Sequence, residues 1–218
     1  MIDSAKAETM AFQGRDKLGL TEFDRLVRRA RTCRRFDETM RVPCEFLYEL
    51  VNLAHFSPCG ANAQRLRFHV VSDVDECSAV FENLAWAAAL KDWAGPAEGE
   101  RPTGYVAVLA ERAAAGKPAP AITEVDCGIA AQTMMLAARS ATPEVAACIF
   151  KAFRPGVVQA MGLDADRLEL KLIMAFGVPV ERQVIDTADS NPNGTLQYWR
   201  DENLVHHVPK LGLEQVLV

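Results

Sequence analysis

The chain has 218 residues, half of them hydrophobic, and its 24 basic and 29 acidic side chains leave a net charge of −5. This length suits one domain of ordinary size, and the near balance of charge argues against general binding to nucleic acids. No run approaches the roughly 20 apolar residues that cross a bilayer. The first residues lack the layout of a signal peptide, so we expect a cytoplasmic protein that binds neither membrane nor nucleic acid.

Residues 1–20 are predicted to be a loosely held arm. The next segment carries apolar side chains at helical spacing, so we expect a helix capped by Thr21. Its core-facing residues would be Phe23, Leu26, Val27 and Ala30. A second helix should begin at Pro43 and cover about 46–55.

The middle of the chain alternates strand and helix patterns, which predicts a mixed α/β or α+β sheet flanked by helices. The predicted strands are 67–72, 104–110, 144–150 and 168–178, and the predicted helices are 74–90, 122–140 and 155–161. The run 104–110 is apolar throughout, which is typical of a strand covered on both faces. We interpret the methionines of helix 122–140 as core packing rather than as a cofactor-binding face.

The character of the chain changes after Val178. A hairpin turned near Asn203 is predicted within 196–208, and an apolar tail follows. If exposed, this tail would favour aggregation, and a second copy of the chain is its simplest cover, so we expect a homodimer. The predicted division, within one domain overall, is an arm at 1–20, a core at 21–178 and a C-terminal hairpin and tail at 179–218.

Six cysteines are scattered along the chain without a Cys-x-x-Cys pair. In a chain of this size, that pattern is typical neither of a disulfide framework nor of a zinc site. We therefore expect free thiols, most of them buried, and no metal site.

A basic stretch follows the first predicted helix. If the helix continued through it, Arg31 and Arg34 would share a face, and Thr32 would add a hydroxyl. Two guanidiniums and a hydroxyl suit a phosphate monoester, because arginine forks match its oxygens. The alternative is a solvated basic surface, since further arginines surround these residues.

A second stretch ends the helix at 46–55 with Ser57, Pro58 and Gly60 and then places two amides, Asn62 and Gln64, before a strand. Amides carry both donors and an acceptor, so this turn suits a flat heterocycle that offers N–H and C=O groups. The alternative is an ordinary loop with surface amides.

Together the two stretches resemble the nitroreductase family of flavin mononucleotide (FMN) enzymes. The family pattern is Arg-Ser-x-Arg-x-Phe followed by Ser-Pro-Ser-x-x-Asn-x-Gln, and here Thr32 and Cys59 stand for the two serines. Further similar runs extend the resemblance over about residues 25–215. It implies an α+β fold, a central mixed sheet flanked by helices, and a homodimer in which a C-terminal extension embraces the partner and FMN lies between the subunits.

The resemblance also implies which residues hold FMN. The phosphate and ribityl contacts would be Arg31, Thr32, Arg34 and, from a second family-like run near the C-terminus, Lys210. The contacts of the flavin ring and ribityl chain would be Ser57, Pro58, Asn62 and Gln64. Leu211 replaces the final arginine of the family ending, which would remove roughly 1.5–3 kcal/mol of phosphate binding if nothing replaces it.

One departure concerns a glycine-rich turn that, in the family, brings backbone N–H groups to the reactive edge of the flavin. This chain has Glu144, Ala146 and Ala147 at the corresponding positions. Alanine keeps the N–H but loses glycine-only torsions and close approach, so Ala146 and Ala147 could hold the flavin differently. The alternative is that alanine simply tolerates an extended strand start.

The function implied by the resemblance is hydride transfer from NADH or NADPH through the flavin to a nitroaromatic, quinone or related small-molecule acceptor, by ping-pong kinetics. The flavin N5 would carry the chemistry, so no catalytic side chain is expected. The sequence has no Gly-x-Ser-x-Gly, His-Glu-x-x-His or Gly-x-Gly-x-x-Gly motif that would indicate another mechanism. Two alternatives remain open: a flavoenzyme of the same fold that performs dehalogenation, ring dehydrogenation or flavin cleavage, and a non-catalytic flavin-binding dimer.

Overall fold

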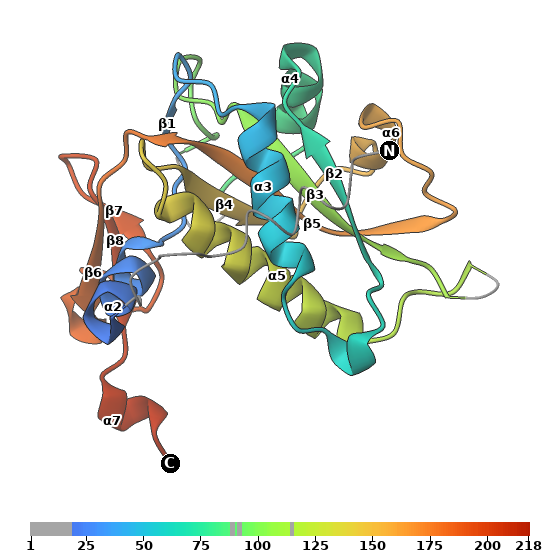
Figure 1. The fold of residues 1–218 in the computed structure, drawn as a ribbon. Helices are drawn as coiled ribbons and strands as arrows, with labels where there is room; N and C mark the ends of the chain where they lie inside the picture. Colours follow the sequence, from blue (N-terminus) through green and yellow to red (C-terminus); the bar gives the residue numbers. More distant parts are fainter. Residues whose placement is uncertain (1–18, 88–89, 91–92, 114–115) are drawn as a thin grey trace.

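The computed structural model describes residues 19–87, 90, 93–113 and 116–218. The predicted arm at 1–20 lies outside these residues except for its last two. A central sheet carries helices on both faces, and a second, smaller sheet lies to one side of it (Figure 1). No helix in this part of the chain combines the length and the apolar character needed to cross a bilayer.

The central sheet has five strands in the order β1-β5-β3-β2, with β4 also paired to β5. They are β1 (Phe36–Asp37), β2 (Leu66–Val71), β3 (Gly104–Glu111), β4 (Ala146–Phe150) and β5 (Leu168–Pro179). Along one edge β5 pairs with β3, and along the other it pairs first with β4 and then with β1. The α+β class is confirmed. The sequence predicted a mixed sheet, whereas all strand pairs of this sheet are antiparallel.

Within the described residues the helices are α2 (Leu20–Arg29), α3 (Cys44–His55), α4 (Val74–Glu82), α5 (Ile122–Arg139), α6 (Val157–Ala160) and α7 (Leu213–Val216), with short 3-10 turns η1 (Gly60–Asn62) and η3 (Ala188–Ser190). Four of the helices, α3, α4, α5 and α6, cover the two faces of the central sheet, whereas α7 lies beyond the small sheet (Figure 1). Helices α3 and α5 share one core cluster, and α4 and α6 share another. The α2 and α7 helices contribute few or no buried residues to either cluster.

Strand β3 is buried on both faces, as its apolar run predicts. Val106 and Val108 belong to the core under α3 and α5, whereas Tyr105, Ala107 and Leu109 belong to the core on the opposite face. Alternate side chains of a strand point to opposite faces, so one continuous apolar run supplies both cores.

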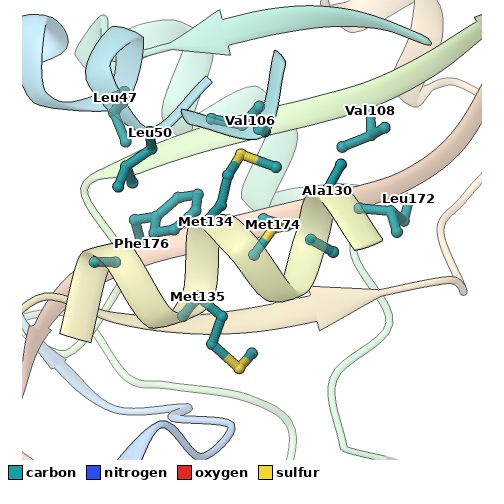
Figure 2. Packing of buried hydrophobic residues seen from close by; sticks show 14 of the residues in the cluster. Leu47, Leu50, Val106, Val108, Ala130, Met134, Met135, Leu172, Met174 and Phe176 are labelled. Atoms are coloured by element: carbon teal, nitrogen blue, oxygen red, sulfur yellow. The ribbon is translucent and has the colours of Figure 1, made fainter. Parts of the chain in front are cut away.

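The methionines of α5 pack in the core, as the sequence predicts. Met134 is fully buried and Met135 nearly so. Figure 2 shows Met134 reaching from α5 toward Leu50 of α3 and Val106 of β3. Because these contacts fill the space between the helix and the sheet, α5 is a rigid support for whatever is attached to it.

Two predicted helix boundaries were wrong. Helix α2 begins at Leu20 with Gly19 as its cap, because the Gly19 N–H donates to the Glu22 carboxylate at 2.7 Å, so Thr21 lies inside the helix. Helix α4 ends at Glu82 rather than near 90. There Leu84 leaves the helix to form a bridge with Phe153.

The side of α2 that was predicted to face the core is only partly buried. Ala30 is buried, but Phe23 is 41% exposed and Leu20 is 83% exposed. Helix α2 packs against α5 at the margin of the molecule, so its apolar stripe is not fully covered by the residues that the structure describes.

The predicted C-terminal hairpin is present. Strands β7 (Trp199–Arg200) and β8 (His206–Lys210) pair antiparallel, and β8 also pairs in parallel with β6 (Gln183–Thr187). The apolar tail is exposed, with Leu213 at 70% and Leu217 at 65% of their accessible surface. Its predicted role in embracing a partner stays a prediction.

All six cysteines are free thiols, and four are buried. Burial raises the pKa of Cys33 to about 11 and that of Cys148 to about 12. These thiols therefore stay protonated at neutral pH, which fits packing rather than reactivity.

A glycine substitution tests the junction of β5 with β1. A Cβ at Gly177 would lie 2.7–2.8 Å from atoms of the fully buried Phe36 side chain. We expect Gly177→Ala to lower the free energy of unfolding by about 1–3 kcal/mol, measured by urea denaturation. The matched control is Gly156→Ala, because a Cβ there has no neighbour closer than 3.6 Å. An equal loss in both variants would contradict the packing.

Candidate functional site

The arginine-rich stretch is not helical, so the shared helical face predicted for Arg31 and Arg34 was wrong. Helix α2 ends at Arg29, and the Arg31 guanidinium donates to the carbonyls of Val27 and Ala30 at 2.8 and 2.9 Å. These are among the last carbonyls of the helix, which have no partner within it. The Arg31 side chain therefore caps the C-terminal end of α2, whereas the sequence predicted that the helix would continue through Arg31.

The charge of Arg31 is not balanced by a carboxylate among the described residues. Neighbouring arginines are balanced: Arg28 pairs with Asp24, Arg29 with Glu144 and Arg35 with Glu100. Arg31 is partly buried, and burial lowers the pKa of its guanidinium. A partly desolvated cation without a counter-ion favours an anion beside it.

Arg34 is buried by the C-terminal segment. Its guanidinium lies 4.2 Å from the centre of the Tyr198 ring and 3.2 Å from His206 Nε2. Its backbone N–H donates to Glu181 Oε2 at 2.9 Å. A guanidinium has no lone pair to accept with, so Arg34 is the donor and His206 Nε2 the acceptor. The predicted phosphate contact of Arg34 stays a prediction, and its side chain already has two partners within this chain.

Glu181 is the centre of this buried group, and the sequence analysis missed it. Its side chain is fully buried and also pairs with Arg200 at 2.5 Å. His206 Nδ1 lies 3.9 Å from the same carboxylate. Burial lowers the pKa of His206 to about 4, although Glu181 opposes this shift. Neutral His206 can therefore accept from Arg34, and the group joins residues 31–35 to the small sheet.

His207 points to the other side of β8. It stacks on Trp199 with 4.1 Å between the ring centres, and its Nδ1 contacts Asp186. The opposite directions of His206 and His207 follow from the alternation of side chains along a strand.

The residues that replace the family glycines lie in and before an extended strand. Ala146 and Ala147 are buried in β4, and no residue from 142 to 148 has a positive φ. Glu144 pairs with Arg29 at 2.7 Å and lies 3.5 Å from Arg139. Glycine torsions are thus not needed here, which agrees with the alternative that alanine tolerates a strand start.

The outer edge of β4 lies beside the arginine-rich stretch. Cys33 N–H donates to the Ala147 carbonyl at 3.0 Å, on the side of β4 that faces away from β5. In an antiparallel pair, alternate residues direct both backbone groups to the same side, so Ala147 and Ile149 turn their N–H groups to this outer edge. These groups could bind the polar edge of a heterocycle.

The amide-bearing loop is strained. Ala61, Asn62 and Gln64 have positive φ values of 51°, 50° and 47°, and the amides of Asn62 and Gln64 are exposed. Such a conformation costs of order 1–3 kcal/mol per non-glycine residue and is found mainly at functional sites. The loop therefore has a property of ligand-binding loops that the sequence did not reveal.

Helix α5 holds this loop through two hydrogen bonds. Ser57 Oγ lies 2.9 Å from Thr133 Oγ1, and the Gly60 N–H donates to Asp126 Oδ1 at 2.8 Å. A cavity of about 140 Å³ beside the loop is lined by residues that include Ser57, Pro58, Gln64 and Asp126. The sequence analysis gave neither Asp126 nor Thr133 a role. Glu124 lies in the same helix, so the sequence offered no signal that singled out Asp126.

Lys210 lies apart from the other candidates. It is exposed at the end of β8, opposite Thr187 of β6. Four residues of extended strand place it about 13 Å from His206 and hence from Arg34. Its predicted phosphate contact stays a prediction.

The candidates form two groups at opposite ends of α5 (Figure 1). Residues 31–34 and β4 lie near its C-terminal end, where the Val145 N–H donates to the Ala138 carbonyl. The loop 57–64 runs along the helix from Thr133, which contacts Ser57, to Asp126, which holds Gly60 nearer the N-terminal end. Twelve residues of helix separate Asp126 from Ala138, which is about 18 Å along the axis.

Comparison with known proteins identifies the family. The model of the nitroreductase family matches residues 27–178. The chain belongs to the nitroreductase family. This confirms the family resemblance and the oxidoreductase class expected from the sequence. No curated protein matches this nitroreductase-family chain.

Solved structures share the fold at low sequence identity. A protein of Desulfovibrio desulfuricans, provisionally named a nitroreductase and solved with FMN, is 22% identical over 72% of this chain and 85% of its own, with a TM-score of 0.57. A protein of Staphylococcus epidermidis, provisionally named an NAD(P)H:FMN oxidoreductase, is 16% identical over 94% of this chain and 99% of its own, with a TM-score of 0.63. A protein of Clostridium acetobutylicum, provisionally named an NADH oxidase, is 18% identical over 71% and 87%, with a TM-score of 0.53.

The low pKa of His206 predicts acid sensitivity. The unfolded chain binds a proton on this residue near pH 6.5, whereas the folded chain does so only near pH 4, so stability falls as the pH drops through this window. We expect this residue to remove about 2 kcal/mol of unfolding free energy between pH 7.5 and pH 5. Urea denaturation at both pH values measures the loss. His206→Gln, which keeps an acceptor but does not titrate, should lose less, and an equal loss would contradict the assignment.

Proposed function

We propose that this nitroreductase-family chain is an FMN-dependent NAD(P)H oxidoreductase that reduces nitroaromatics, quinones or related small acceptors by ping-pong hydride transfer. The observation that carries the proposal is the partly buried Arg31, which pairs with no carboxylate among the residues that the structure describes and lies close to the outer edge of β4. When bound, FMN supplies the hydride-accepting centre of this chemistry. We further propose that the enzyme acts in the cytoplasm.

The phosphate end of the cofactor fits the arginine-rich stretch. Arg31 offers a cation that lacks a carboxylate partner among the described residues, and Thr32 beside it is partly exposed. A phosphate dianion would relieve the cost of a desolvated guanidinium, since hydrogen bonds between charged groups are the strong ones. In this proposal Arg31 and Thr32 bind the phosphate and ribityl chain, and Arg34 and Lys210 assist if the C-terminal segment adjusts.

The ring end fits exposed amides and backbone groups. Asn62 and Gln64 present side-chain amides on a strained loop, and Ala147 and Ile149 turn N–H groups to the outer edge of β4. Both kinds of group can bind the N–H and C=O groups of a flavin. Holding the ring between them would orient it and exclude water from one side, which is the protein's part in flavin chemistry.

Two chains are needed for this arrangement. Within one chain, Asp126, which holds Gly60 of the loop, lies about 18 Å along α5 from Ala138, which is next to the arginine-rich stretch and β4. We therefore propose that a homodimer binds FMN at its interface, with the amides from one subunit and the arginine-rich stretch from the other. Exposed apolar side chains on α3 and α5, two helices that pack together, support this: Tyr48, Leu53 and Phe56, and Ile122 and Val125. Such patches on a soluble protein mark interaction surfaces.

The names of three structural neighbours agree with the proposed cofactor. The proteins from Desulfovibrio desulfuricans and Exiguobacterium sibiricum were solved with FMN, and the staphylococcal one is named for both NAD(P)H and FMN. These names support the choice of cofactor and of electron donor for this chain.

Visible spectroscopy tests the proposal. We expect the purified protein, supplied with FMN, to be yellow and to bleach when NADH or NADPH is added under nitrogen, with colour restored by a quinone or a nitroaromatic compound. A protein that takes up no FMN would contradict the proposal. Flavin that NAD(P)H cannot reduce would indicate a non-catalytic flavin-binding dimer, and reduced flavin inert to both acceptors would indicate another chemistry on this fold.

Complementation tests the two-chain site. Arg31→Ala removes the phosphate cation, and Asn62→Gly removes an amide while tolerating the positive φ, so each variant alone should bind FMN weakly. After the two are mixed and refolded together, about a quarter of the sites should bind FMN normally, because half of the dimers are mixed and each has one intact site of two. Recovery of no sites would mean that both groups act within one chain. Fluorescence of free FMN measures occupancy.

A further inference from the structure

We infer that Asp126, together with Gly60, positions the amide-bearing loop for the flavin. The inference rests on the proposed function and extends it to residues that do not themselves contact the cofactor. Its basis is the juxtaposition of a strained loop, a buried carboxylate and a close backbone approach at the first two turns of α5.

The loop needs an external support. Three of its residues, Ala61, Asn62 and Gln64, are in the left-handed region, which non-glycine side chains rarely occupy. Such conformations persist only where the surroundings over-determine them. The contacts with α5 support the loop at Gly60, on Asp126, and at Ser57, on Thr133, while the Arg67 guanidinium donates to the Gln64 carbonyl at 2.9 Å at its far end.

Asp126 is poorly explained as a residue for stability alone. It is 2% exposed, and its Oδ2 atom is buried with no hydrogen-bond partner in the described part of the chain. An apolar residue or alanine would avoid the cost of a buried acceptor left unpaired. Asp126 Oδ1 accepts the hydrogen bond that the Gly60 N–H donates, at 2.8 Å, and this is the contact by which the carboxylate holds the loop.

Glycine at position 60 makes this contact possible. A Cβ there would lie 2.5 Å from Cγ1 of Ile122, in the first turn of α5. Any side chain would therefore push the loop away from the helix and lengthen the hydrogen bond to Asp126. Gly60 and Asp126 thus act as a pair: one permits the approach and the other holds it.

Holding Gly60 in place affects the residues that lie two to four positions further along the chain. With Gly60 held on α5, the left-handed residues between Ala61 and Gln64 follow, and the side chains of Asn62 and Gln64 are exposed. Without this support the loop can relax to ordinary torsions, and each residue that leaves the left-handed region redirects its side chain. Asp126 is therefore a positioning residue for the flavin ring.

The first test measures FMN affinity of the reconstituted apoprotein by fluorescence titration. We expect Asp126→Ala to raise the Kd by about tenfold or more. Asp126→Asn keeps an oxygen acceptor for the Gly60 N–H and should restore the affinity to within about threefold of wild type. Met134→Ala, in the same helix and buried in the core, should lower the melting temperature without changing the Kd.

The second test uses the close approach of Gly60 to the Ile122 side chain. Gly60→Ala should weaken FMN binding, because the new methyl group meets Ile122. Adding Ile122→Ala removes the atom that it meets, so the double variant should bind FMN nearly as well as Ile122→Ala alone, which is the reference because Ile122 also belongs to the exposed apolar surface. This rescue does not require Asp126→Ala to fold, and a general loss of stability would not produce it.

The outcomes separate this inference from the proposed function. If the wild-type protein binds no FMN, the proposed function is wrong and the inference falls with it. If the wild type binds FMN while Asp126→Ala and Gly60→Ala bind it equally well, the proposed function stands and the inference is overturned. A double variant of Gly60 and Ile122 no better than Gly60→Ala would also overturn it.

Discussion

The packing of α5 against the central sheet determines where both groups of candidate contacts lie. Its apolar side fills the core under α3 and β3, with Met134 fully buried. It holds the amide-bearing loop through Asp126 in its second turn and Thr133 further along, and its C-terminal end lies beside Glu144 and β4. Because the helix is a close-packed rod, the distance between the two groups is set by its length, and one chain cannot shorten it.

This separation along α5 is the physical reason for proposing a dimer. A cofactor that needs both a carboxylate-free guanidinium and the exposed amides must recruit them from different copies of the chain. The exposed apolar residues on α3 and α5, and those of the C-terminal tail, are surfaces on which a second copy could pack. Cofactor binding and assembly would then be linked, since each FMN would contact both subunits.

The C-terminal segment adds a second constraint. Glu181, Arg200 and His206 enclose the guanidinium of Arg34, so this arginine stabilises the junction between the small sheet and residues 31–35. Buried ionic groups of this kind are costly to break one partner at a time. Arg31, whose partners within the described part of the chain are backbone carbonyls, is the freer of the two arginines for an anion.

The sequence alone determined the family, the longer strands and helices of the core, the two-sided burial of β3 and the interior role of the α5 methionines, because these follow from local apolar patterns and motifs. It did not predict the strands β1 and β6. It could not determine that the Arg31–Arg34 stretch is irregular, that Arg34 is enclosed by Glu181 and His206, or that Asp126 holds Gly60. Those contacts join residues 66 to 172 positions apart. They depend on how α5 and the two sheets pack, and only the tertiary structure decides which distant polar groups are brought within hydrogen-bonding distance.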